Sequence, residues 1–451
     1  MVLSLPQNVK TVIEILEKNG YEAYIVGGCV RDELLGRTPK DYDITTSAIP
    51  EQIKKVFRDY RVTDTGIRHG TVTVIVNGES FEITTYRKDG AYSDRRRPDS
   101  VIFSSSLTDD LARRDFTINA MAYNPRGGLA DPYDGQSDLF RRKISCVGNP
   151  EKRFGEDALR IMRALRFSSE LGFKLEDGTA EAVHYMKDLL KEISAERISN
   201  ELSLLLCGKE PFEVLTEFSD VIAVIVPEIA PCIDFDQHNR YHLYDVWTHS
   251  AAAVARSVPD PDVRLALMLH DIGKPSCLKK DDEGNGHFYG HEKLSADIAE
   301  NVLHRLRFPS DKIERAAKLI RYHYITPVDD EKVVKRLLST LGNEDFFLLT
   351  EVMKGDNRAK QSFCYERVRV IEAMQAKAQK IIGENQCIKI SDLAVDGNDM
   401  LELGYSGKAV GDILKSVLEA VIDEKLPNER EALLGFAREH FNVPEPPPNF
   451  V

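Results

Sequence analysis

Two aspartates near the amino end of the chain have the spacing of a carboxylate pair that could hold divalent cations. Asp41 and Asp43 lie two residues apart in the segment KDYDI, where we expect a short strand. Side chains at positions i and i+2 of a strand point to one face, so both carboxylates project together. Carboxylates this close repel each other unless cations neutralise them. Metal ions held there can activate an attacking hydroxyl and stabilise a leaving group.

A Gly-Gly turn precedes the aspartates. Gly27 and Gly28 follow residues 24–26, which predict a strand, and a short helix is expected over residues 30–35. Glycines at the entry to a helix let backbone N–H groups approach an anion, and Arg31 could add charge toward the same phosphate. Gly-Gly alone is more often just a tight strand-to-helix turn. The aspartates that follow it make phosphate binding the favoured interpretation.

A segment with two acidic residues followed by three arginines, EDALRIMRALRF, is predicted to be helical. Asp157 and Arg160 are three residues apart and would share one helix face, which Arg163 and Arg166 continue. An aspartate accepts hydrogen bonds and an arginine donates several in a fixed fork, so together they could pair with the edge of a nucleobase. The alternative is an ion pair on a solvated helix surface.

The second half of the chain carries six potential metal ligands. They are His249, His270, Asp271, His291, His323 and Asp356. Imidazole and carboxylate suit borderline transition metals, and a consecutive His-Asp pair can ligate one or two ions. A lone histidine on an apolar helix is usually packed in the core, but six ligands in this order predict a metal site that activates water. Lys274 could contact a phosphate or cap a helix, and His287 is left out of the ligand set.

The elements that position these residues change in character near residue 150. Before it, helix and strand signals alternate: residues 7–18 are amphipathic at helical spacing, and two β-rich runs, 71–76 and 80–84, are joined by Asn77-Gly78, a hairpin signal. After it, the pattern is almost entirely helical. We therefore expect an α+β chain with a small mixed-sheet head and a long helical body.

The segment GGCVRDELLGRTPKDYDITTSA resembles the signature of the class II tRNA nucleotidyltransferases and bacterial poly(A) polymerases, within the DNA polymerase β superfamily. The resemblance implies a polymerase β-like head in which Asp41 and Asp43 hold Mg²⁺. Glu82 is placed to be the family's third carboxylate, although a surface-facing strand residue would fit the same pattern. The segment LARRDFTINAMAYNP is similar to the block that contacts the ribose and triphosphate, so Arg114 and Asp115 inherit that role.

Further segments extend the resemblance to almost the whole chain. The EDALR block resembles the one that selects CTP and then ATP, which gives Asp157 and Arg160 the base-reading role. The remaining expected contacts to phosphate or ribose come from Gly28, Arg31, Arg163 and Arg166. Residues 85–115 occupy the place of the family's flexible loop at full length, which points to complete CCA addition. The histidine set resembles the HD phosphohydrolase superfamily, in which a second divalent transition metal would be bound.

The resemblance implies four parts. We expect a nucleotidyltransferase head over residues 1–148, an all-helical neck with the nucleotide-selecting helix over 149–225, an HD domain over 226–380 and a helical tRNA-binding tail over 381–451. The expected partners are tRNA, CTP and ATP, and the chain is expected to be a monomer or homodimer.

The overall composition narrows the class of protein further. The 451 residues carry a formal net charge of -13, which counts against a protein that coats nucleic acid over its whole surface. Local basic clusters, including Arg95–Arg97, could still line a groove. The seven cysteines are scattered without a CxxC, and no apolar run approaches the roughly 20 residues of a membrane span. We therefore expect a cytoplasmic protein with reduced thiols and no membrane partner.

Three alternatives stay open at this point. A CC-adding enzyme or a poly(A) polymerase would have the same head. A signalling enzyme could combine such a head with an HD hydrolase, although it would not need a base-selecting helix. A tRNA-binding scaffold with an inactive site is the non-enzymatic alternative.

Overall fold

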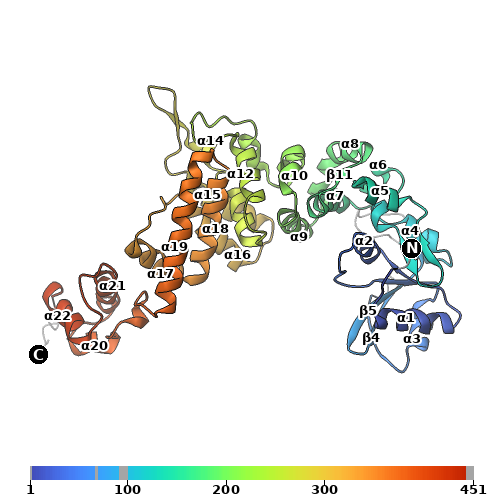
Figure 1. The fold of residues 1–451 in the computed structure, drawn as a ribbon, viewed down its shortest axis with the longest axis horizontal. Coiled ribbons are helices and arrows are strands. Elements are labelled where there is room, and N and C mark those ends of the chain that lie inside the picture. The colour runs from blue at the N-terminus through green and yellow to red at the C-terminus, as the bar shows by residue number, and fades with distance from the viewer. Residues whose placement is uncertain (1–2, 67–69, 91–99, 443–451) are drawn as a thin grey trace, which may run out of the picture. The chain divides into compact units, whose positions relative to one another are not determined.

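The computed structural model describes the whole chain apart from residues 1–2, 67–69, 91–99 and 443–451 (Figure 1). The arginines at 95–97, and with them the middle of the expected flexible loop, lie outside the described residues. The chain forms two compact units, Met1–Ile233 with Val302–Phe308 and Asp234–Asn301 with Pro309–Val451. The four domain boundaries expected from the sequence stay a prediction.

The first unit begins with a mixed sheet of seven strands in the order β3-β4-β5-β2-β1-β8-β9. The bounds are β1 Ala23–Val26, β2 Ile44–Thr46, β3 Arg61–Gly66, β4 Thr71–Val76, β5 Glu79–Thr85, β8 Ala122–Asn124 and β9 Gly128–Ala130. The predicted hairpin at Asn77-Gly78 is confirmed, since β4 and β5 pair antiparallel across it. Among the described strands of this sheet, only β2 and β5 pair in parallel.

Helices accompany the sheet. They are α1 Gln7–Lys18, α2 Gly28–Leu34, α3 Pro50–Val56, α4 Leu107–Ala112 and α5 Gly135–Arg141. The predicted amphipathic helix over residues 7–18 is confirmed as α1. It buries one face, formed by Val9, Val12, Ile13 and Leu16, at the spacing of a helix that packs one stripe against a core. Near the described part of the loop, the short strands β6 Arg87–Asp89 and β7 Val101–Phe103 pair with each other.

Helices make up most of the remainder of the first unit. They are α6 Pro150–Glu156, α7 Leu159–Leu171, α8 Asp177–Met186, α9 Ala195–Leu206, α10 Pro211–Glu217 and α11 Ser219–Ile225. One expectation is wrong here, because the helix predicted to carry Asp157 and Arg160 together breaks. Asp157 has extended backbone angles (φ -141°, ψ 103°) between α6 and α7, and only Arg160 lies within α7.

The second unit is helical. Its larger bundle contains α12 Val246–Ala255, α13 Pro261–Leu269, α14 Lys274–Cys277, most of α15 His291–Arg305, α16 Ser310–Tyr322, α17 Glu331–Leu341, α18 Asn343–Arg358 and α19 Tyr365–Gly383. The chain continues through α20 Gly397–Glu402, α21 Lys408–Ile422 and α22 Arg430–His440, which share a core of their own around Met400, Val417 and Leu433. Within the described residues, no helix is long and apolar enough to cross a bilayer.

Candidate active sites

Three carboxylates, those of Asp41, Asp43 and Glu82, lie near one another where β2 and β5 run side by side. Ile44 pairs with Ile83 in the parallel register, so Asp43 and Glu82, one residue earlier on each chain segment, are neighbours on one face of the sheet. Asp41 is two residues before Asp43. The strand begins at Ile44, so both aspartates lie just before β2 rather than within it, although the carbonyl of Asp43 still accepts a hydrogen bond from the Val26 N–H at 3.0 Å.

The charges at this strand end are unfavourable for one another. Crowding by protein atoms raises the pKa of Asp43, and the carboxylates of Asp41 and Glu82 raise it further, whereas Arg114 lowers it. All three carboxylate side chains nevertheless reach solvent. A solvent-accessible group of acidic oxygens with a residual excess of negative charge fits a hard divalent cation such as Mg²⁺.

Arg114 fixes the turn that enters α2. Gly27 has φ +83°, and a Cβ built on it would lie 2.9 Å from the Arg114 Nη1. A side chain at this position would therefore be strained and would push the guanidinium away. Arg114 forms an ion pair with Asp110, in which the Arg114 Nη2 lies 3.3 Å from the Asp110 Oδ2. The Gly-Gly turn is thus shaped around an arginine that faces the Asp43 carboxylate.

Arg31 and Asp115 belong to one buried hydrogen-bond network. Arg31 Nη1 donates to the Oδ1 of Asn119 at 2.8 Å, and the Asn119 amide donates to the Asp115 Oδ1 at 3.3 Å. Asp115 in turn accepts two bonds from Arg163 of α7, from Nε at 2.8 Å and from Nη2 at 2.6 Å. The network therefore ties α2 to α7 through side chains that the sequence placed in two separate motifs.

The ion pair between Asp115 and Arg163 is strong. Burial opposes the charge on Asp115, but Arg163 and the N–H of Phe116 outweigh it and lower the pKa of Asp115 to about 2. Arg163 also lies 3.8 Å from Glu201 of α9, and Arg166 lies 2.8 Å from the same carboxylate. The arginines of α7 are thus held in place by carboxylates from two other segments.

Phe167 is a functional candidate that the sequence did not single out. The guanidinium groups of Arg31, Arg163 and Arg166 lie 5.1, 5.3 and 3.9 Å from its ring centroid. A buried ring that contacts three arginines holds their planes in position by cation–π attraction. The only sequence signal for this role was its place one residue after Arg166.

Asp157 and Arg160 point to different partners. Asp157 accepts a hydrogen bond from the Leu159 N–H at 3.1 Å and another from Arg197 of α9 at 2.9 Å. Arg160 binds Glu156 at 2.8 Å and donates to the carbonyls of Arg153 and Arg113 at 3.1 Å each. The two side chains are close in sequence, and each is anchored by partners of its own.

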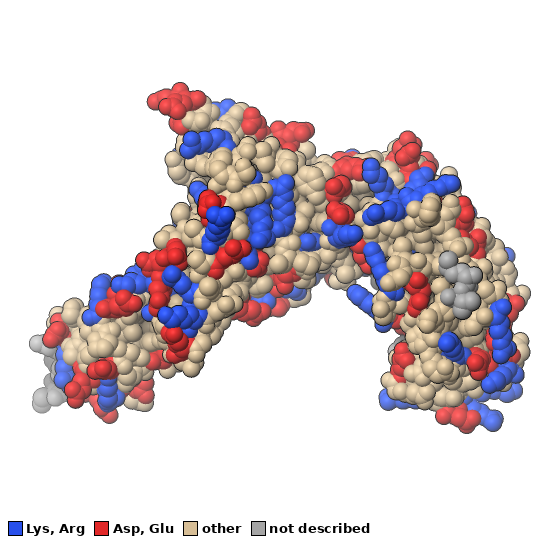
Figure 2. All heavy atoms as spheres, viewed as in Figure 1, with Lys and Arg blue, Asp and Glu red and all other residues tan. Residues whose placement is uncertain are grey.

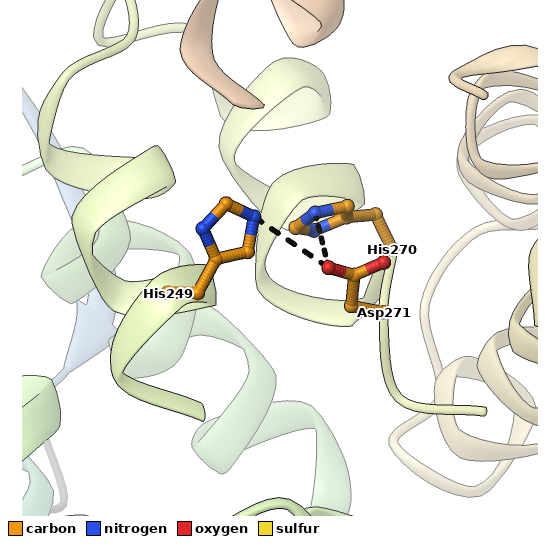
Figure 3. Close-up of side chains that lie close together, drawn as sticks. All are labelled: His249, His270 and Asp271. Carbon is orange, nitrogen blue, oxygen red and sulfur yellow. Dashed lines mark ion pairs between the residues drawn. The ribbon is translucent and has the colours of Figure 1, made fainter. Parts of the chain in front are cut away.

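The six expected ligands in the second unit come together in its interior. All are buried, at the ends or inside of α12, α13, α15, α16 and α18: His249, His270, Asp271, His291, His323 and Asp356. The Oδ2 of Asp271 lies 3.1 Å from the His270 Nε2 and 3.5 Å from the His249 Nε2 (Figure 3). Its Oδ1 lies 3.3 Å from the His291 Nε2 and 3.8 Å from the His323 Nε2.

Three of the imidazole rings are oriented by the main chain. The Nδ1 atoms of His270, His291 and His323 lie 2.6–2.7 Å from the carbonyl oxygen three residues earlier. Nδ1 must donate in each case, which turns Nε2 toward Asp271. This is the outer hydrogen bond that accompanies a metal-ligating histidine. Two groups of potential ligands result, and they share Asp271. The first consists of His249, His270 and Asp271, the second of Asp271, His291 and His323, and within each group the ligand atoms lie within 4.8 Å of one another.

The electrostatics of this cluster fit a cation. Burial lowers the pKa of His249 to about 4 and that of His323 to about 3, so both rings are neutral ligands at neutral pH. Burial opposes a charge on His270 too, but Asp271 and Asp356 raise its pKa to about 9. The Nε2 atoms of His270 and His291 and the Oδ1 of Asp271 are buried without a well-formed hydrogen bond, whereas the Asp271 Oδ2 has an ion pair with Lys274. Such unsatisfied ligand atoms are what a transition metal would bind.

Two lysines flank the cluster. Lys274 Nζ lies 2.6 Å from the Asp271 Oδ2, and Lys360 contacts the Asp356 Oδ2 at 2.5 Å. Both line a cavity of about 550 Å³ that opens onto Asp271 and His291. Lys360 was not singled out from the sequence. His242 was missed as well: its ring packs edge-on against His249 at 4.7 Å and it lines the same cavity.

Models of known families match three separate stretches of the chain. The Poly A polymerase head domain matches residues 23–145, and the probable RNA and SrmB-binding site of polymerase A matches 172–233. A putative tRNA nucleotidyltransferase domain 2 matches 288–437. None of these matches covers the segment from α12 to α14 with His249, His270 and Asp271.

Curated relatives extend the similarity to the whole chain. The CCA-adding enzyme of Lactobacillus delbrueckii subsp. bulgaricus is 51% identical over 220 residues, which is 49% of this chain and 54% of the relative. The CCA-adding enzyme of Lactiplantibacillus plantarum is 33% identical over 434 residues, which is 96% of both chains.

Solved structures agree with the fold. The CCA-adding enzyme of Bacillus stearothermophilus, solved in complex with CTP, matches with a TM-score of 0.73 and 29% identity over 96% of both chains. The Thermotoga maritima enzyme complexed with tRNA shares the fold at a TM-score of 0.58 and 20% identity, over 94% of this chain and 93% of that one. The predicted fold class, a polymerase β-like head with a mixed sheet followed by a helical body, is confirmed. The chain belongs to the CCA-adding enzymes, a family of nucleotidyltransferases.

Proposed function

We propose that this chain adds C, C and A to the 3′ end of tRNA from CTP and ATP and releases pyrophosphate. The observation that carries the proposal is the parallel register of β2 and β5, which brings Glu82 beside Asp43. Asp41, two residues earlier in the sequence, adds a third carboxylate. Three carboxylates on one face, opposite Arg114, suit the in-line transfer of a nucleotide to a hydroxyl.

Mg²⁺ is the proposed cofactor, held by Asp41 and Asp43 with Glu82 as the third carboxylate. When bound, it would activate the tRNA 3′-hydroxyl and stabilise the leaving pyrophosphate. Arg114 is positioned by Asp110 to attract the triphosphate to the same strand end. The network from Arg31 through Asn119 to Asp115 holds the turn at Gly28 rigid during the transfer.

We assign the remaining nucleotide contacts to α7 and the residue before it. Arg163 and Arg166 present guanidinium groups to phosphate or ribose, and Phe167 keeps them in position. Asp157 and Arg160 are the proposed base readers. The Oδ2 of Asp157 accepts a hydrogen bond from Arg197 at 2.9 Å, which orients the carboxylate, and its remaining lone pairs can accept from a nucleobase.

Extension of tRNA that lacks its CCA end tests the proposal. With labelled CTP and ATP supplied separately and together, we expect two C additions from CTP and a final A only when both are present. Asp41→Ala should abolish extension. Asp59→Ala, which removes an exposed acidic residue of the same domain, should not. Addition of C alone from the mixture would instead identify a CC-adding enzyme, and long A tails on any RNA a poly(A) polymerase.

The histidine cluster supports a second activity, and we propose a metal-dependent phosphohydrolase site at His249, His270, Asp271, His291, His323 and Asp356. A bound divalent transition metal would activate water toward a phosphate ester. Lys274 and Lys360 contribute positive charge on the wall of the adjacent cavity, where the phosphate would lie.

Metal analysis and hydrolysis test the second activity together. The purified chain should retain a divalent transition metal and hydrolyse bis(p-nitrophenyl) phosphate, and His270→Ala should lose both. His304→Ala is the matched control, because His304 is an exposed histidine of α15 away from the cluster. A metal-free wild type that stays inactive after addition of Mn²⁺, Ni²⁺ or Co²⁺ would rule the site out as a hydrolase.

We propose a cytoplasmic location, where reduced thiols persist, because none of the seven cysteines, all within the described residues, forms a disulfide. The expected monomer or homodimer stays a prediction.

A further inference from the structure

We infer that the second unit carries a separate binding surface for single-stranded RNA, at the mouth of the cavity above the histidine cluster. It is formed by residues 239–242 before α12, by the ends of α12 and α18, and by the start of α19 with the turn before it. We call it the arginine–aromatic surface. It goes beyond both proposed activities, since binding there requires neither catalytic centre.

Five arginines gather on this surface. They are Arg240, Arg256, Arg358, Arg367 and Arg369. Arg256 and Arg358 each donate to the other's carbonyl oxygen, and both line a shallow pocket of about 440 Å³ with Arg369. Among the described residues, the first four have no carboxylate at ion-pair distance, and only Arg369 has one, Glu366 at 2.9 Å.

Such a concentration of unneutralised positive charge stands out in a chain with a net charge of -13. On the face drawn in Figure 2, basic side chains also gather over the helices of this unit. Arginines that protein carboxylates do not neutralise are available to phosphates. Acidic residues also line the cavity: Asp281 and Glu283 from the loop over residues 281–285, and Asp271 and Asp356 from the histidine cluster.

Aromatic side chains interleave with these arginines. Tyr241 lies under two of them, with its ring centroid 5.2 Å from the Arg240 guanidinium and 5.8 Å from that of Arg367. Phe363 packs against Tyr241 at 5.7 Å and is still 54% exposed, and Tyr365 beside Arg358 is 46% exposed. Exposed rings among arginines are the arrangement on which unpaired bases stack while phosphates bind the guanidinium groups.

The surface leads directly into the cavity. Tyr241 and Arg367 line the cavity as well as the surface, and Tyr289 and Tyr324, 72% and 62% exposed, stand at other parts of its rim. A duplex hides its bases, so these rings favour an unpaired strand over double-stranded RNA. A strand bound here would place a phosphate near Lys360.

Fluorescence anisotropy with a labelled, unstructured RNA 12-mer tests the surface on the full-length chain. We expect binding whose affinity falls with salt. Arg256→Ala combined with Arg369→Ala should reduce the salt slope by about 0.7 for each phosphate that the variant no longer binds. Tyr365→Ala should weaken binding about tenfold, as removal of one stacked base would. Arg321→Ala, an exposed arginine of α16, is the matched control and should change neither value.

Two results would overturn the inference. One is RNA binding that the arginine and tyrosine variants leave unchanged, and the other is displacement of the RNA by an acidic peptide at equal charge, which would mark a protein-binding surface. Extension of tRNA by the same variants gives an independent readout. It should stay at the wild-type rate, and a parallel loss of tRNA affinity would show that the surface is part of the tRNA site rather than a separate one.

Discussion

Replacing Asp115 by asparagine should loosen the connection between the catalytic head and α7. The substitution keeps the size of the side chain and its contact with the Phe116 N–H, but removes the charge that binds Arg163 through two bonds of 2.8 and 2.6 Å. Arg163 would then keep its contact with Glu201 at 3.8 Å and its cation–π contact with Phe167. The variant therefore isolates the contribution of one buried ion pair.

The pKa of Asp115 gives the magnitude. A carboxyl whose pKa falls from its ordinary 3.8 to about 2 on folding contributes about 2 kcal/mol, at about 1.36 kcal/mol per pKa unit. Because the folded-state pKa is depressed, this contribution is fully present above pH 4 and is lost as the pH falls toward 2. The difference in stability between wild type and variant should therefore be largest near neutral pH and shrink below pH 4.

Hydrogen exchange of the α7 peptide, followed by mass spectrometry, measures this difference locally. At pH 6 the variant should exchange these amides roughly 30-fold faster than wild type, the equivalent of about 2 kcal/mol. At pH 3 the ratio should be smaller. Asp188→Asn, which alters an exposed ion pair with Lys191, should leave α7 unchanged. Equal exchange at pH 6, or a ratio that persists at low pH, would refute the reasoning.

Three other changes should have distinct effects. Gly27→Ala introduces a Cβ at φ +83°, 2.9 Å from Arg114. It should destabilise the head by about 1 kcal/mol or more, measured by a thermal melt, and lower the rate of tRNA extension. Glu82→Gln preserves shape and should slow extension roughly a hundredfold while raising the Mg²⁺ concentration needed, which a metal titration would show. His291→Ala should lower the amount of bound transition metal and remove the stabilisation that metal gives against urea. Trp247, the only tryptophan, is buried in α12 and reports this unfolding by fluorescence.

The sequence predicted those parts of the site that local geometry determines. Asp41 and Asp43 are related by the two-residue period of extended chain, and Asn77-Gly78 determines how β4 and β5 pair. The proximity of Glu82 to Asp43 depends on β2 pairing parallel with β5, a contact between segments nearly forty residues apart. No local pattern encodes that pairing, and only the resemblance to a family suggested it.

The errors and omissions have the same origin. Helical spacing placed Asp157 on one face with Arg160, but Arg197 from α9 binds Asp157 where the chain leaves the helix. The six candidate ligands were singled out by their residue types and their order along the chain, whereas His242 and Lys360 have ordinary local surroundings. Their roles come from tertiary packing around the cavity, which single-sequence periodicity does not describe.

The carbonyl-anchored histidines have a consequence for how the second unit could evolve. Because the main chain aims His270, His291 and His323, their orientation does not depend on which side chains line the cavity. Residues around the rim of the cavity can be exchanged, and the preference for a ligand altered, while the three Nε2 atoms keep their orientation toward Asp271. Conversely, a change that frays the end of α13 or α16 would rotate an imidazole and weaken metal retention without touching any ligand.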